Sequence, residues 1–472
     1  MKPVQTMSML RRSFLTHSAG GAGLLALSQL LGSDSRRAAA APNARSGGIS
    51  ASPKARSVIC LFQHGGPSQV DLFDPKPALT KWDGKKYPGG ELEVHAETQI
   101  GNVLASPFKF RRHGQSAIEL SELLPHLGNV IDDVTLIRSM TTDAVDHEAA
   151  LRCFHTGRRD AGFPTWGSWV TYGLGSECED LPAYVVLTDP GGLPVDGNRN
   201  WSSGWLPAIH QGTPFSIGDN APIVHLKPPA NMPKEAREEQ LAFLDQLNRH
   251  HLKQHADSHD LAARIQNFEL AAQMQTSVPA LLDISDETEA TRQMYGLDNK
   301  ITHNYGMRCL IARRMVERGV RFVQLSLAEQ PWDTHTNNAA ELVNQCAKTD
   351  QPSAALIRDL KQRGLLDSTI VVWGGEFGRL PIAQGTDGRD HNRHGFSLWV
   401  AGGGFRSGYV HGATDEFGYR SVQDPVTVHD LHATLLHALG LNHYRLSYPR
   451  EGRETSLTDA EVTQARVVDA LL

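Results

Sequence analysis

Three features are scarce in this 472-residue sequence, and each scarcity excludes a class of protein. Only five cysteines are present, an odd number whose spacing fits no disulfide framework and no zinc motif, although one disulfide would be allowed. No apolar run is long enough to span a bilayer, so the sequence predicts no membrane span. Basic residues form no block, and the net charge of −6 argues against a nucleic-acid partner. The 40% hydrophobic content instead indicates a globular protein with a sizeable core.

The first forty residues have the order of an export signal. A basic pair, Arg11-Arg12, precedes an apolar stretch at residues 19–31 and then small residues suited to cleavage. The pattern resembles a twin-arginine signal peptide. We therefore expect a signal peptide over residues 1–40 that the twin-arginine export machinery reads, a linker over 41–56, and a mature protein in the periplasm or outside the cell. A disordered amphipathic tail is the alternative.

Short apolar runs recur along the chain. They are SVICLF (57–62), VTLIRSM (134–140), AYVVLTD (183–189), RFVQLSL (321–327), TIVVWGG (369–375) and SLWVAGG (397–403). Nearly continuous apolar runs are typical of strands buried on both faces of a parallel sheet. Helical patterns lie between them, so the sequence predicts an α/β fold. Residues 230–300 are charged and poor in strand formers, and there we expect a helical insertion.

Histidines and carboxylates gather beside these runs. They are His64 after the first run, His147 after the second, Asp333 and His335 after the fourth, Glu376 and Arg379 after the fifth, and Asp390, His391 and His394 before the sixth. In open α/β sheets, sites collect at the carboxyl ends of the strands, so these side chains are expected to meet at one edge. Asp333 and His335 are two residues apart and would point the same way in extended backbone.

Mixed imidazole and carboxylate ligands suit a divalent Zn, Mn or Fe ion better than calcium, which is a weaker candidate. The alternative is a buried polar network that ties the loops together. The choice between His391 and His394 stays open.

The order of the segments resembles the alkaline phosphatase superfamily, and within it the sulfatase-like branch. The motifs HGGPSQVDLFDPKP near the start and GGEFGRLP later are similar to those of an exported family of unknown function, domain-of-unknown-function family 1501. In this resemblance Glu376 occupies a metal-ligand position, and His394 falls where sulfatases place a basic residue. The resemblance implies an alkaline phosphatase/sulfatase-like three-layer sandwich over residues 57–472, with a mostly parallel central sheet and the helical insertion at about 230–300.

The nucleophile motif of sulfatases is missing from this sequence. Sulfatases carry Cys or Ser nine residues before the Thr of a Thr-Gly-Arg, and here that threonine is Thr156 while the residue nine positions upstream is His147. The formylglycine nucleophile therefore cannot form at that place. Thr141, Thr142 and Ser68 are the remaining hydroxyl candidates, and attack by water on a metal is the simplest mechanism.

The sequence therefore favours an exported, metal-dependent hydrolase of sulfate, phosphate or related anionic esters, acting on a small molecule or a polysaccharide. The predicted metal ligands are His64, Asp333, His335, Glu376, His391 and His394. The predicted catalytic residues are His147, which is also a candidate ligand, and Arg158 and Arg379, which would stabilise an anionic transition state. An ordinary ion pair is the alternative for each arginine. The rival hypothesis is a non-catalytic exported binding or envelope scaffold that kept the fold, and the missing nucleophile motif supports it.

Overall fold

The computed structural model describes residues 53–95, 100–217, 233–255 and 259–472. The predicted signal peptide at 1–40 and most of the predicted linker at 41–56 lie outside the described residues. All five cysteines are buried and unpaired, so the one disulfide that the sequence would allow is not formed. Among the helices in the described ranges, none is both long and apolar enough to cross a membrane.

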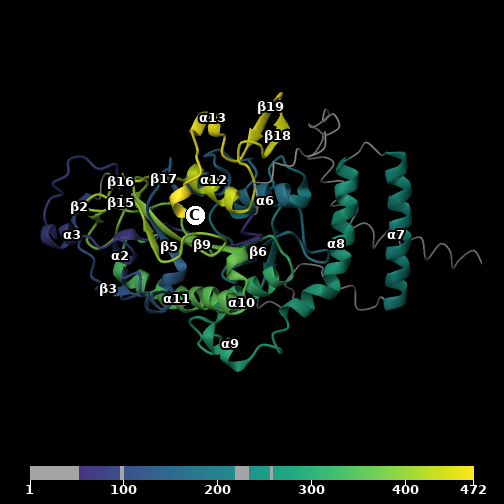
Figure 1. Cartoon of the computed structure of the whole chain (residues 1–472), viewed down its shortest axis with the longest axis horizontal. Coiled ribbons are helices and arrows are strands. Elements are labelled where there is room, and N and C mark those ends of the chain that lie inside the picture. Colours follow the sequence, from purple (N-terminus) through teal and green to yellow (C-terminus); the bar gives the residue numbers. More distant parts are fainter. Residues whose placement is uncertain (1–52, 96–99, 218–232, 256–258) are drawn as a thin grey trace, which may run out of the picture.

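A nine-stranded, mostly parallel sheet forms the centre of the molecule (Figure 1). Its order is β14 (Tyr409–His411), β5 (Val134–Thr141), β13 (Phe396–Ala401), β9 (Thr369–Gly374), β1 (Ser57–Phe62), β8 (Phe322–Leu325), β6 (Tyr184–Thr188) and β7 (Thr213–Ser216), with β17 (Val426–Thr427) also beside β5. All pairings are parallel except those of β13, which runs antiparallel to β5 and β9. Each of the six apolar runs of the sequence forms one of these strands.

The central strand β1 shows why these runs are continuously apolar. All six of its residues are buried, and alternate side chains enter different cores. Ile59 and Leu61 pack into one hydrophobic cluster, whereas Cys60 and Phe62 pack into the other. Because successive side chains of a strand point to opposite faces, a strand covered on both faces needs apolar residues at every position.

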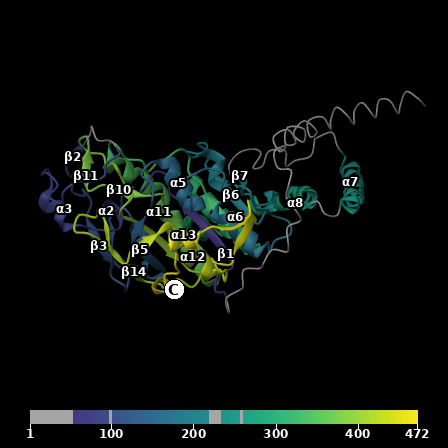
Figure 2. The ribbon, with the colours of Figure 1, turned by 90° about the horizontal axis from the view of Figure 1, so that it is seen from above.

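A layer of helices covers each face of the sheet, which confirms the predicted three-layer α/β sandwich (Figures 1 and 2). On one face lie α10 (His303–Glu317) and α11 (Asn338–Gln362), and on the other lie α5 (His147–Thr156), α6 (Trp166–Leu174) and α12 (Val428–Ala438). Ile311 of α10 and Leu356 of α11 share a core with Ile59. Gly319, at φ +86°, follows α10 in the left-handed region, where glycine is favoured.

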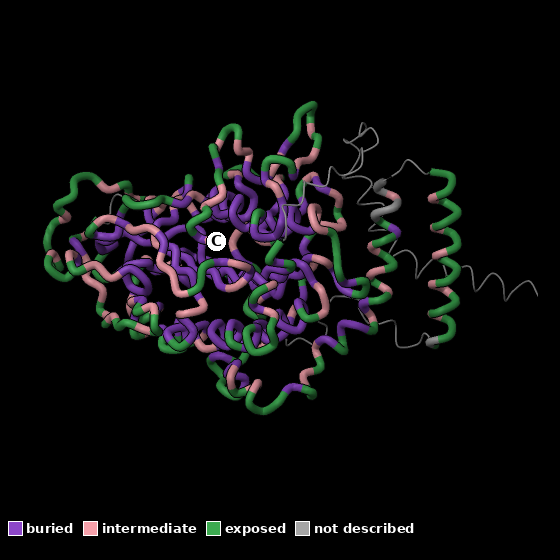
Figure 3. The backbone as a smooth tube through the Cα atoms, viewed as in Figure 1, coloured by how far each residue is buried: buried purple, intermediate pink, exposed green. Residues whose placement is uncertain are grey.

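The stretch at 230–300 holds α7 (Lys234–Gln254), α8 (His259–Leu282) and α9 (Glu289–Met294). The second half of α8 joins the main core through Met274, Val278 and Leu281. In contrast, α7 stands off from the body, and Figure 3 shows it mostly exposed with some half-buried positions.

Shorter elements complete the fold around the sheet. The helices are α2 (Gln69–Leu72), α3 (Pro77–Trp82), α4 (Pro125–Gly128) and α13 (Ala460–Thr463). The two-stranded pairs are β2 (Ile100–Val103) with β11 (Ile382–Gln384), β3 (Phe110–His113) with β4 (Ile118–Ser121), β10 (Gly378–Arg379) with β12 (His391–Asn392), β15 (Ala413–Thr414) with β16 (Ser421–Gln423), and β18 (Ser447–Arg450) with β19 (Arg453–Ser456). The long connection from β9 to β13 contains β10, β11 and β12 and lies at the carboxyl end of β9.

Candidate metal centre

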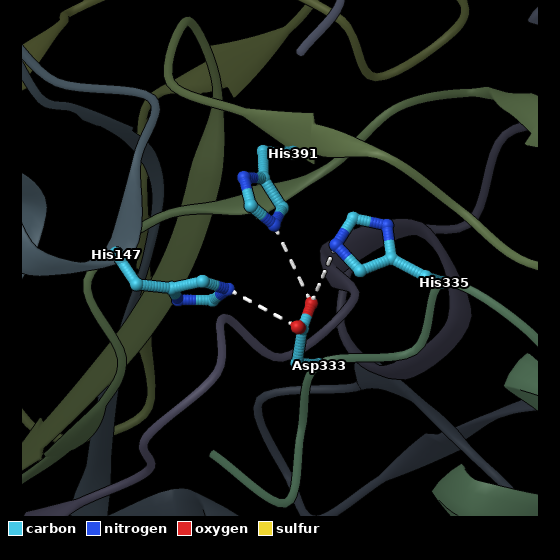
Figure 4. Close-up of side chains that lie close together, drawn as sticks. All are labelled: His147, Asp333, His335 and His391. Atoms are coloured by element: carbon cyan, nitrogen blue, oxygen red, sulfur yellow. Dashed lines mark hydrogen bonds and ion pairs between the residues drawn. The ribbon is translucent and has the colours of Figure 1, made fainter. Parts of the chain in front are cut away.

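Four side chains from three distant parts of the chain meet at the carboxyl edge of the sheet (Figure 4). His147 begins α5 shortly after β5, Asp333 and His335 follow β8, and His391 lies in β12 just before β13. One ligand atom of each lies within 4.8 Å of the ligand atoms of the other three. We call these four residues the His/Asp cluster.

Asp333 lies at the middle of the cluster. Its Oδ2 is 3.3 Å from Nε2 of His147, and its Oδ1 is 3.1 Å from Nε2 of His335 and 3.4 Å from Nε2 of His391. All three imidazoles therefore present the same nitrogen, Nε2, toward one carboxylate, as Figure 4 shows.

The opposite nitrogen of each ring is held by an oxygen of the protein. Nδ1 of His147 is 2.7 Å from Oε1 of Glu376, Nδ1 of His391 is 2.7 Å from the carbonyl of Val145, and Nδ1 of His335 bonds Oε1 of Gln384. An ionised carboxylate, a carbonyl and an amide oxygen only accept hydrogen bonds, so each Nδ1 donates. In the neutral ring the lone pair is then on Nε2, and this outer hydrogen bond is what metal-binding histidines normally have.

Local folding places these side chains. The side chain of Asp146 caps α5 by accepting from the backbone of Ala149 at 2.9 Å, so the helix begins with His147. The antiparallel register of β10 with β12 sets His391 opposite Arg379. Both segments are thereby fixed by backbone geometry.

The loop that carries Asp333 is fixed to the end of β1. The indole of Trp332 donates to Oε1 of Gln63 at 2.9 Å, and the backbone N–H of Trp332 donates to the carbonyl of His64 at 3.1 Å. Gly65, at φ +110°, allows this approach, because a Cβ there would lie 2.5 Å from the backbone nitrogen of Asp333. The backbone N–H of Gly65 donates to Oε1 of Glu376 at 2.9 Å, which also ties this turn to the residue that holds His147.

Arg379 forms a buried ion pair with Asp333. Its side chain is fully buried, and its Nη2 lies 2.6 Å from Oδ1 of Asp333. Its other N–H groups donate to the carbonyls of Gly66 and Arg389, at 2.9 and 3.0 Å, and Nη2 also bonds the carbonyl of Gly65. The guanidinium is thus surrounded by protein acceptors, and it fixes the position of the Asp333 carboxylate.

Burial and neighbouring charge set the protonation of the cluster. Burial favours the neutral form of Asp333, but the close contacts of His147 and His391 and the charge of Arg379 hold its pKa well below the usual range. Burial also disfavours a charge on His147, yet the Asp333 and Glu376 carboxylates raise the pKa of His147 to about 9. Burial, with Arg379 and His147 nearby, lowers the pKa of His391 to about 3 although Asp333 opposes this shift. The carboxylate is therefore ionised and His391 is neutral, as metal ligands must be, whereas His147 would have to release a proton on binding a metal.

The residues of the cluster fit a divalent cation. Nε2 of His147 is buried, and despite its proximity to Asp333 it has no partner with hydrogen-bond geometry among the described residues. Three imidazole nitrogens and one carboxylate can together hold a divalent metal. Access is from the side of His335, whose side chain is 31% exposed, whereas that of His391 is 2% exposed.

Three of the residues predicted from the sequence lie elsewhere. His64 is fully buried near the cluster without belonging to it, its Nδ1 accepts from the backbone of Leu327 at 3.4 Å, and burial lowers its pKa well below the usual value. Nε2 of His394 bonds Glu93 at 2.6 Å, and Arg158 pairs with Asp459 at 2.6 Å. Glu376 supports His147 through Nδ1.

Sequence reasoning missed the outer partners. Gln384 and the carbonyl of Val145 hold two of the three rings, and neither carries a recognisable signal. Any backbone carbonyl can accept a hydrogen bond, and a glutamine in a short strand is ordinary, so only the folded geometry identifies them.

The fold and the His/Asp cluster together define an α/β protein with a candidate metal centre at the carboxyl edge of its sheet. The sequence pattern of the family described as "Protein of unknown function (DUF1501)" matches residues 55–472. The chain belongs to this family, as its motifs predicted. A comparison with curated proteins found no match.

Among solved structures, the chain is similar to several hydrolases and a synthase. The lipoteichoic acid synthase from Listeria monocytogenes is 8% identical, with 89% of this chain and 78% of that chain covered and a TM-score of 0.36. A sulfatase from Pseudoalteromonas sp. is 11% identical, with 82% and 68% covered and a TM-score of 0.36. The phosphonate monoester hydrolase from Silicibacter pomeroyi is 11% identical, with 88% and 78% covered and a TM-score of 0.36. Similarities this low carry no argument about the site.

Proposed function

We propose that this protein is a metal-dependent hydrolase of sulfate, phosphate or related anionic esters. The observation that carries the proposal is the convergence of three Nε2 atoms on Asp333 while each Nδ1 is held by an oxygen of the protein. A polar network that served only to tie loops together would not require the same nitrogen of every ring to face one point.

His147, Asp333, His335 and His391 would hold the ion, and the donor set favours Zn or Mn over calcium. When bound, a divalent cation supplies Lewis acidity toward an ester oxygen and toward water. Arg379 keeps Asp333 ionised and in place, and Glu376 keeps Nε2 of His147 pointing into the centre. The exposed edge of His335 leaves a path for an ester group.

Water is the nucleophile of the proposed hydrolysis. Ser68 is fully buried, and its hydroxyl donates to Asp71 at 2.6 Å, so this hydroxyl is already engaged within the protein. At the position of the sulfatase nucleophile the sequence has His147 in place of Cys or Ser. Hydrolysis by direct attack of water therefore needs the fewest additional groups.

The test combines metal analysis with a substrate panel. Purified full-length protein is loaded with Zn or Mn, its metal content is measured, and hydrolysis of aryl sulfate, phosphate monoester, phosphate diester and phosphonate monoester is assayed. We expect about one bound ion and turnover of at least one ester, both lost in Asp333→Asn. Asp367→Asn, an exposed change just before β9 at the opposite edge of the sheet, is the matched control. A folded, metal-free protein that hydrolyses none of the esters and binds polysaccharide would favour the scaffold hypothesis instead.

We propose in addition that the protein is exported through the twin-arginine route to the periplasm or beyond. The support is the order of the Arg11-Arg12 pair, the apolar stretch and the small residues. Replacing both arginines by lysine should leave the full-length precursor inside the cell in a fractionation experiment. Unchanged export of this variant would contradict the proposal.

A further inference from the structure

A short segment beside the His/Asp cluster brings a further imidazole to it. Residues 91–95, with the sequence ELEVH, alternate between exposed and half-buried side chains. Leu92 and Val94 pack against the small hydrophobic cluster that includes Phe417. Because alternate side chains of an extended segment point the same way, Glu93 and His95 share the other face.

Glu93 anchors this face next to the centre. Its carboxylate bonds Nε of Arg393 at 3.0 Å and Nε2 of His394 at 2.6 Å, and its backbone N–H donates to the hydroxyl of Tyr419 at 2.9 Å. His394, which the sequence suggested as a metal ligand, thus holds the segment that carries His95.

One carboxylate joins the backbones of His95 and His391. Oδ2 of Asp390 accepts from the backbone N–H of His95 at 2.7 Å, and its Oδ1 accepts from that of His391 at 2.8 Å. The two imidazoles stack, with their centroids 5.0 Å apart and their planes at 22°. His95 therefore lies on the face of a ring that points into the centre.

Three other groups near the centre are already occupied. Arg379 is buried against carbonyls and Asp333, whereas Arg393 and His394 are paired with Glu93. His95, in contrast, is exposed, and its ring has no hydrogen-bond partner among the described residues. A sulfate or phosphate group at the centre would have several oxygens to be satisfied, and a ring N–H at this place can donate to one of them.

We propose that His95 is a substrate-binding residue of this centre and donates a hydrogen bond to an oxygen of the anionic ester group. The inference rests on the proposed function, since it assigns a residue to the ester bound at the same site. A purely structural role, in which the ring of His95 only covers His391, is the competing explanation.

The experiment separates the hydrogen bond from the ring. His95→Phe keeps an aromatic ring over His391 without a donor, whereas His95→Gln keeps a donor without the ring. His250→Phe, at an exposed position of α7, is the matched control. For each full-length protein loaded with Zn or Mn, we measure metal content, the binding of inorganic phosphate and of sulfate by calorimetry, and KM and kcat for any ester that is turned over.

We expect His95→Phe to keep its metal but to bind the preferred anion at least about tenfold more weakly, with KM raised in step, because a hydrogen bond to a charged group is lost. His95→Gln should recover part of this loss, and His250→Phe should behave as the wild type. Wild-type anion affinity in His95→Phe would overturn the proposal and leave only the covering role.

If the wild-type protein holds metal and binds the anion but hydrolyses no ester, the hydrolase proposal fails, while the affinity of His95→Phe still decides the role of His95. Absence of metal from the wild-type protein would overturn both.

Discussion

Two buried charged centres lie near each other in this molecule, and they are built differently. In the first, Asp71 and Arg389 are both fully buried, and the guanidinium bonds both carboxylate oxygens, at 2.7 and 3.1 Å. Ser68 and Asn338 donate to the same carboxylate, at 2.6 and 3.0 Å. Every polar atom of this pair is satisfied by the protein itself.

The His/Asp cluster is satisfied less completely by the protein. The Nδ1 atoms have protein partners, whereas the Nε2 atoms all face Asp333. A buried charge needs a complete set of partners, and the Asp71–Arg389 pair shows that this chain can supply one from its own residues. Nε2 of His147, which is buried and has no hydrogen-bond partner among the described residues, therefore supports the proposed metal site.

Breaking the Asp71–Arg389 pair should have the largest effect on stability. Asp71→Ala leaves a fully buried guanidinium without its partner, which typically reduces the free energy of unfolding by roughly 3–5 kcal/mol. Chemical denaturation should show this loss both with and without added metal, since the pair needs none. A loss below about 1 kcal/mol would show that Arg389 finds other partners and would break the comparison.

The Asp71–Arg389 pair also has a predicted pH dependence. Burial opposes ionisation of Asp71, but the charge and hydrogen bonds of Arg389 lower its pKa below the ordinary value. Its contribution is therefore present above the pKa of the unfolded chain and is lost as the pH falls through the folded-state pKa. Asp71→Asn should accordingly lose less stability in acid than the wild type does.

The next largest effect on stability is expected at Asp350, a buried carboxylate whose pKa is shifted in the opposite direction to that of Asp71. Asp350 accepts from the backbone N–H groups of His126 and Leu127, at 2.8 and 2.9 Å, and burial raises its pKa to about 7. Because the folded state then binds the proton more tightly than the unfolded chain, stability falls as the pH rises from the unfolded pKa through about 7.

Asp350→Asn removes this titration. Relative to the variant, the wild type should lose about 2–3 kcal/mol between pH 5 and pH 8, measured by denaturation at a series of pH values. Parallel curves for the two proteins would show that the two backbone hydrogen bonds already keep Asp350 ionised.

A smaller effect, on metal affinity rather than on stability, is expected at Glu376, which bonds His147 from outside the cluster. Glu376→Gln weakens the hydrogen bond that orients His147, so zinc affinity should fall about 10–100-fold while the fold is kept. Competition with a chromophoric chelator measures this affinity, and Glu461→Gln on the exposed surface of α13 is the control. Complete loss of binding would indicate that Glu376 is itself a ligand, as the sequence suggested.

The smallest effect is expected at Arg158. Its side chain is 17% exposed and that of its partner Asp459 is 26% exposed, and ion pairs of this kind contribute at most about 1 kcal/mol. Arg158→Gln should therefore change stability by less than that and leave ester hydrolysis near the wild-type rate. A fall of kcat by more than about tenfold would instead support the catalytic role predicted from the sequence.

The strands could be predicted from the sequence because a two-sided sheet requires unbroken apolar runs, as in β1 and β9. Asp333, His335 and His391 could be named because strand ends gather polar side chains at one edge. The choice between His391 and His394 could not be made, because it depends on the register of β12 against β10, which sets His391 beside Arg379.

The position of His95 could not be predicted for a similar reason. Nothing in ELEVH marks it, because its closeness to His391 comes from Asp390 bonding two backbone N–H groups that are far apart in the chain. Contacts of this kind are made by the fold and leave no local pattern.

The antiparallel direction of β13 determines which part of the chain carries the site residues. Because β9 and β13 run antiparallel side by side, the segment at 375–395 leaves the sheet and returns to it at the same edge. That single excursion carries Glu376, Arg379, Gln384 and His391. One contiguous segment therefore supplies several residues of the site at once, and any exchange of it has to keep Arg389, whose buried pair with Asp71 joins the segment to the body.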